Sequence, residues 1–98
     1  MIPLDGCRVR VRDGKHINQQ GYVVMVIDAR DKLSSLRPDE ASQMEKRMRA
    51  QHGSTWMESW YEANVTLSNG VDDVFEGRAL EILEPELIRP ENFHPLRT

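Results

Sequence analysis

The residue types that most often perform enzyme chemistry are few in this sequence and lie far apart. His16, His52 and His94 are separated by long intervals, and Cys7 is the only cysteine, so no pair has the short spacing of metal ligands. The sequence also lacks a glycine-rich loop that leads directly into a helix, the arrangement that binds phosphate. We therefore predict that the protein is not an enzyme and that it uses no metal and no cofactor.

Basic residues alternate with apolar ones near the start of the chain. In the segment 8–12, RVRVR, every second residue is an arginine, and this period predicts a strand with one charged face and one buried face. The candidate nucleic-acid contacts on this face and in the following loop are Arg8, Arg10, Arg12 and Lys15. Such a stripe can bind phosphates. It can also be an exposed strand face that pairs with the acidic second half of the chain.

Three aromatic residues are candidates for an interaction surface: Tyr22, Trp56 and Trp60. If the strand that contains Trp60 extends back to Trp56, both tryptophans lie on the side of the strand that faces away from the core. Two tryptophans on an outer face need either a covering element or a ligand. The sequence leaves both readings open, because a helix bearing Met44 and Met48 could cover them and a bound partner could do the same.

Composition indicates one soluble globular domain, with 98 residues of which 39% are hydrophobic and 30% charged. No apolar run is long enough to cross a bilayer, the first residues do not resemble a secretory signal, and Cys7 is expected to be a small buried residue. These features favour a cytoplasmic protein.

Charge is distributed unevenly along the chain. The net charge is −3, but residues 1–53 carry ten Lys and Arg against seven Asp and Glu, whereas residues 54–98 carry three against nine. A protein that binds duplex nucleic acid usually has a clear basic excess. The charge therefore favours a protein partner.

Five segments have the pattern of β-strands: residues 7–12, 21–29, 60–67, 71–76 and 80–83. The second of these is apolar at every position from 22 to 27, so we expect both of its faces to be covered. In the third, the residues expected to face the core are Tyr61, Ala63, Val65 and Leu67. Ser68-Asn69-Gly70 predicts a tight turn before the fourth.

One helix is predicted over residues 38–52. Pro38 suits the first helical position, acidic residues follow it, and Gly53 can end the helix. Met44 and Met48 fall on one helical face, and Glu45 and Arg49 have the spacing of a favourable ion pair.

The segment 9–26, VRVRDGKHINQQGYVVMV, resembles the KOW motif, in which a strand, a glycine-bearing loop and a second strand begin a small barrel. Gly14 and Gly21 match the outer two glycines of that motif. Asn18 occupies the middle place, and asparagine also tolerates a left-handed backbone.

The order of the predicted elements is similar to that of the Src-homology-3-like (SH3-like) barrels, a group that includes KOW and Tudor modules. The resemblance implies a mainly β fold: an SH3-like antiparallel barrel of about five strands over residues 1–84. The helix lies in an insertion over residues 34–54, and an extended C-terminal tail covers residues 85–98.

The resemblance implies a non-catalytic binding or adaptor module, and the acidic balance favours a protein partner within a nucleic-acid-processing or ribonucleoprotein assembly. Direct binding of RNA or DNA through the arginine face is the first alternative. A symmetric homo-oligomeric small-barrel enzyme and a docking subunit of a larger complex are two others.

Overall fold

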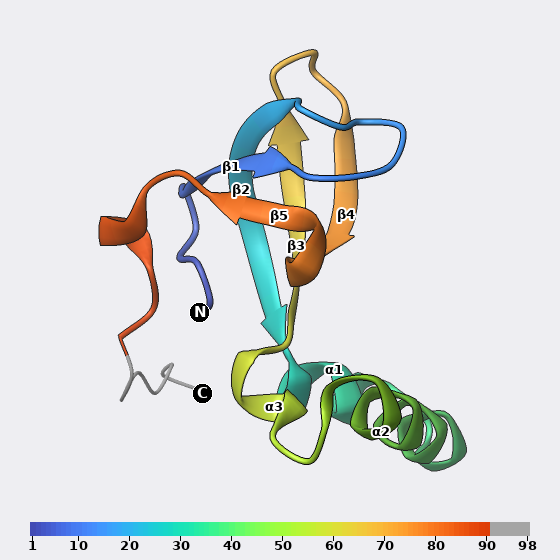
Figure 1. The fold of residues 1–98 in the computed structure, drawn as a ribbon. Coiled ribbons are helices and arrows are strands. Elements are labelled where there is room, and N and C mark those ends of the chain that lie inside the picture. Colours follow the sequence, from blue (N-terminus) through green and yellow to red (C-terminus); the bar gives the residue numbers. More distant parts are fainter. Residues whose placement is uncertain (91–98) are drawn as a thin grey trace.

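The computed structural model describes residues 1–90, and within them the chain forms one five-stranded antiparallel sheet and three α-helices (Figure 1). The strands are β1 (Arg8–Val11), β2 (Gln20–Asp28), β3 (Tyr61–Leu67), β4 (Asp72–Glu76) and β5 (Leu80–Ile82). The helices are α1 (Ala29–Ser35), α2 (Pro38–His52) and α3 (Trp56–Ser59), and the single 3-10 turns are η1 (Gly77–Ala79) and η2 (Pro85–Leu87).

The strands lie in the order β4-β3-β2-β1-β5, so neighbours along the chain are neighbours in the sheet except where β5 returns to pair with β1. The predicted antiparallel five-stranded structure is confirmed. Within residues 1–90, the two edge strands β4 and β5 do not pair with each other. The hydrogen-bonded sheet of the described residues is therefore open.

The sheet core follows the alternation of the sequence. Val9 and Val11 of β1 are fully buried while Arg8 is exposed, and alternate residues of β3 are buried as predicted. The buried residues of this cluster, which we call the sheet core, are Ile2, Cys7, Val9, Val11, Val23, Tyr61, Ala63, Val65, Leu67 and Leu80. One face of the sheet thus builds the core.

The expectation that both faces of β2 are covered is wrong. Val23 faces the sheet core, but Tyr22, Val24 and Met25 are exposed. The pairing of β2 with β3 shifts between Val23 and Met25, so Val24 is an extra residue in a β-bulge. The apolar run therefore covers the core with one side only.

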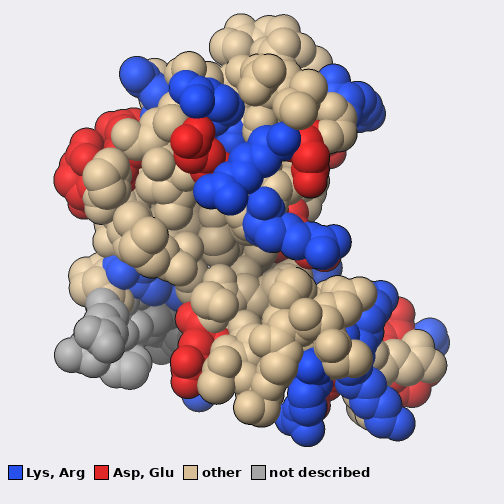
Figure 2. Space-filling model, viewed as in Figure 1, with Lys and Arg blue, Asp and Glu red and all other residues tan. Residues whose placement is uncertain are grey.

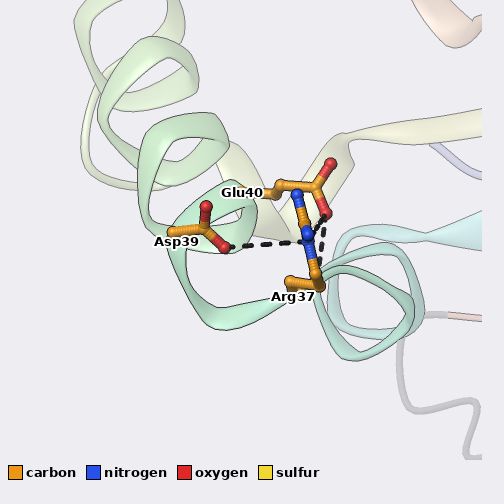
Figure 3. A network of polar contacts seen from close by, with 3 residues as sticks. All are labelled: Arg37, Asp39 and Glu40. Atoms are coloured by element: carbon orange, nitrogen blue, oxygen red, sulfur yellow. Dashed lines mark hydrogen bonds and ion pairs between the residues drawn. The ribbon is translucent and has the colours of Figure 1, made fainter.

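The insertion between β2 and β3 is larger than predicted. Helix α2 spans the predicted residues, but α1 precedes it and α3 follows it, so the helical region runs from Ala29 to Ser59 rather than over 34–54. The Glu40 carboxylate caps the start of α2, because it accepts hydrogen bonds from the backbone N–H of Arg37 at 3.4 Å and from its Nε at 3.0 Å (Figure 3). The predicted pair Glu45–Arg49 forms at 2.7 Å.

The chain after β5 packs against the N-terminal segment. Pro3 and Ile88 form an isolated antiparallel bridge, and the backbone N–H of Arg89 donates to the carbonyl of Ile2 at 2.7 Å. The Arg89 guanidinium also lies 3.2 Å from the carboxylate of Asp28, at the start of α1. Of the predicted tail, residues 91–98 lie outside the described part of the chain.

Two small residues in the loop between β1 and β2 have a left-handed backbone, and a third, Gly21 at the start of β2, allows close packing of two strands. Gly14 has φ of 80° and Asn18 has φ of 70°, so the left-handed backbone expected of Asn18 is observed. Gly21 has no positive φ. A Cβ there would lie 2.4 Å from the backbone oxygen of Thr66, so glycine is needed because β2 and β3 approach closely.

We predict that Gly21→Val lowers the free energy of unfolding by about 1–3 kcal/mol, because the new side chain must push β3 away. Gly14→Asn is the matched control: the position is open, and asparagine accepts its backbone conformation. Thermal melting measures both. Equal melting temperatures for Gly21→Val and the parent protein would contradict the close approach of the two strands.

Candidate functional site

The arginine face of β1 is largely engaged by neighbouring side chains. Arg8 donates from Nη2 to the hydroxyl of Tyr22 at 3.0 Å, and its guanidinium lies 5.4 Å from the centre of that ring. Arg10 forms an ion pair with Glu81 at 3.1 Å. Arg12 and Lys15 are exposed, and no ion pair engages either within the described residues. The four predicted basic residues therefore do not act as one uniform stripe.

The two tryptophans are buried, since Trp56 is 2% exposed and Trp60 is 8% exposed. The structure therefore shows that the helical insertion covers them. The idea that β3 extends back to Trp56 is wrong, because Trp56 begins α3. Residues four apart in a helical turn share a face, and the two rings meet edge to face with centroids 6.2 Å apart.

These rings belong to a second hydrophobic cluster, separate from the sheet core. We call it the helical core, and its buried residues are Ala29, Met44, Met48, Trp56 and Trp60. Trp60 is the C-cap of α3 and has an extended backbone, and Tyr61 begins β3, so their side chains point to opposite sides as in a strand. As a result, Trp60 packs in the helical core and Tyr61 in the sheet core.

Tyr61 is fixed on its other side by Gly77. A Cβ on Gly77 would fall 2.3 Å from the Tyr61 ring, so the 3-10 turn η1 can approach the ring only because residue 77 has no side chain. Burial raises the pKa of the Tyr61 hydroxyl to about 12. The phenol therefore remains neutral at physiological pH.

A cavity of about 450 Å³ lies where the sheet meets the insertion. We call it the β5 groove. One wall comes from α3 and the start of β3, and the other from β5 and η1. Its principal lining residues are Trp56, Ser59 and Trp60 on the first wall and Leu80, Glu81 and Ile82 on the second. Figure 2 shows Lys and Arg side chains over the middle of this face, above the hollow between the sheet and the helices.

A second candidate surface lies on the outer face of the sheet. We call it the outer patch, and it consists of Tyr22, Val24, Met25 and Val74, which are 49%, 51%, 60% and 53% exposed. Met25 and Val74 flank Asn64, because Asn64 of β3 pairs with both residues in the sheet. The patch thus combines apolar side chains of β2 and β4 on either side of the polar Asn64 of β3, and sequence reasoning missed all of them except Tyr22.

His16 and Cys7, two further groups that could do chemistry, lie close to neighbouring residues of the sheet core and its edge. The ring of His16 lies edge-on to Phe75, with centroids 6.1 Å apart, and its Nε2 lies 3.4 Å from the Asp73 carboxylate. Cys7 is fully buried, as expected, and its burial raises the pKa of the thiol. Within residues 1–90, no His, Cys, Asp and Glu side chains gather in a group able to hold a metal ion.

None of the helices in the described region has the length and apolar character needed to cross a membrane. Comparisons of the chain with protein-family models, with curated proteins and with solved structures find no match. The two candidate surfaces therefore rest on geometry alone.

We predict that Trp60→Ala lowers the free energy of unfolding by about 3–5 kcal/mol, because it removes a large buried ring from the helical core. Met57→Ala is the control, since Met57 is an exposed residue of the same short helix and its loss should cost less than about 0.5 kcal/mol. Chemical denaturation measures both values.

Fluorescence gives a second readout of the same burial. In a Trp56→Phe background, acrylamide should quench Trp60 poorly. Ready quenching, together with an unchanged stability of Trp60→Ala, would contradict the packing of Trp60 under the insertion.

Proposed function

We propose that this protein is a non-catalytic binding module that recognises a protein partner through the outer patch. The observation that carries this proposal is the exposure of four large apolar side chains on one face of a rigid sheet. Contiguous exposed apolar surface is typical of protein–protein contact sites. Tyr22 adds the aromatic residue that binding hot spots favour.

The charge around the outer patch indicates what kind of partner it takes. On the outer face, the strand register places the acidic residues Glu62, Asp72 and Glu76 on β3 and β4, whereas Arg8 lies against Tyr22 on the β1 side of the patch. Lys32 compensates Glu62 at 3.4 Å, whereas within residues 1–90 the carboxylate of Asp72 accepts a hydrogen bond from the neutral hydroxyl of Thr66 at 2.6 Å and forms no ion pair. We expect a partner surface that is apolar at its centre and basic on the side that meets β3 and β4.

The fold and the setting are also part of the proposal. The strand order β4-β3-β2-β1-β5, with the insertion between β2 and β3, supports an SH3-like small barrel. The resemblance of residues 9–26 to the KOW motif supports a role within a nucleic-acid-processing or ribonucleoprotein assembly. Direct contact with RNA or DNA has less support, because Tyr22 and Glu81 already engage Arg8 and Arg10.

We predict that the chain captures a partner from its native host, that nuclease treatment leaves the complex intact, and that Met25→Asp with Val74→Asp abolishes it. Tyr22→Ala alone should cost about 2 kcal/mol of binding free energy. Calorimetry with the purified partner measures this value. Ile17→Asp is the control, because Ile17 is equally exposed but lies in the loop between β1 and β2.

Loss of the captured protein after nuclease treatment would contradict the proposal and favour the nucleic-acid alternative. Equal capture by the Met25 and Val74 double variant and by the parent would exclude the outer patch as the contact. Self-association of the purified chain, removed by the double variant, would show that the occupant of the patch is a second copy.

A further inference from the structure

The strand β5 ends the sheet and has backbone groups without partners. The N–H of Arg12 donates to the carbonyl of Ala79 at 2.8 Å, and the N–H of Leu83 donates to the carbonyl of Arg8 at 2.9 Å. In an antiparallel pair these bonds alternate. The backbone groups of Leu80 and Ile82, between the bonded positions, therefore point away from β1.

Only one of those outward groups has an internal partner. The N–H of Leu80 donates to the carbonyl of Gly77. Among the described residues, the carbonyl of Leu80 and both the N–H and the carbonyl of Ile82 form no hydrogen bond. This set of one donor and two acceptors is what a further strand would pair with.

The β5 groove provides the space that such a strand needs. Leu80, Glu81 and Ile82 all line the cavity, so its volume of about 450 Å³ lies directly beside the free edge. A paired strand lies about 4.8 Å from its neighbour and alternates its side chains between two sides. One side chain of an added strand would face the aromatic wall formed by Trp56, Trp60 and Tyr61.

The charges lining the groove favour an acidic occupant. Glu81 is paired with Arg10 at 3.1 Å, and Glu76 is paired with Arg78 at 3.2 Å. Arg12 also lines the groove, and no ion pair engages it in the described part of the chain. The uncompensated guanidinium therefore attracts a carboxylate.

We infer that the β5 groove is a second binding site, distinct from the outer patch, that takes an extended acidic peptide segment of a partner protein as an added strand. The backbone of that segment pairs with Leu80 and Ile82. Its apolar side chains enter the groove at alternate positions, and an acidic side chain meets Arg12. Strand addition to a free sheet edge is an established mode of peptide recognition, and this inference does not depend on the function of the outer patch.

The experiment selects short peptides from a phage-displayed random library on the full chain. The selected peptides should share an acidic residue and apolar residues at alternate positions. In the NMR spectrum, a bound synthetic copy should slow solvent exchange of the Ile82 amide. It should change the amide of Leu83 little, because Leu83 already donates to Arg8.

Methylation of single peptide nitrogens tests the backbone pairing directly. Affinity should fall about tenfold at alternate positions and much less at the positions between them. Arg12→Gln should weaken binding about two- to fivefold, and Lys15→Gln, outside the groove, should leave it unchanged.

Three results would overturn the inference. The library could yield no enriched peptide, methylation could change affinity without alternating along the peptide, or solvent exchange of the Ile82 amide could stay unchanged when the peptide saturates the protein. Binding that is lost in the Met25 and Val74 double variant but kept in Arg12→Gln would assign the peptide to the outer patch instead. A negative result for peptide binding in the β5 groove would leave the proposed function of the outer patch unaffected.

Discussion

The structure depends on the way in which two adjacent residues, Trp60 and Tyr61, pack into two different cores. The helical insertion interrupts the sheet between β2 and β3, and these strands remain paired to the residues where the insertion begins and ends, Asp28 and Tyr61 (Figure 1). Because β3 starts where α3 stops, one side chain anchors the helices and the next anchors the sheet. The ion pair of Arg89 with Asp28 adds a connection from the C-terminal segment to the same junction.

Both candidate surfaces lie near this junction. The helices of the insertion pack around the tryptophans after the end of β2, and Tyr22, Val24 and Met25 of β2 remain exposed. The β5 groove lies between α3 and the edge of β5, so the junction that places α3 also forms one wall of the groove.

Sequence patterns predicted the elements with strong periodicity. The bounds of α2 follow from Pro38 and Gly53, and the buried residues of β3 follow from simple alternation. Short helices such as α1 and α3 carry too few residues for a periodic signal, and the sequence therefore left open whether the strand containing Trp60 extended back to Trp56. The bulge at Val24 could not be read from a continuous apolar run, because such a run fits a strand covered on either one or two sides.

The candidate site was the least predictable part. Tyr22 was a candidate interaction residue from the sequence, and the structure places it on the exposed face. Met25 and Val74 come near each other only through the pairing of β2 and β4 with β3. The free edge of β5 is likewise a property of sheet order, since the sequence Leu80-Glu81-Ile82 does not show which side of the strand is paired. The pairing of strands that are far apart in the sequence determines both the outer patch and the free edge of β5. No local sequence pattern shows that pairing.

Proton–proton contacts in the NMR spectrum of the native chain test the junction most directly. We predict contacts from the Trp60 indole to the methyl group of Met44 or Met48, and contacts from the Tyr61 ring to the α-protons of Gly77. Contacts of both rings with the same core, or a Trp60 indole without contact to either methionine, would contradict the division of these residues between two cores.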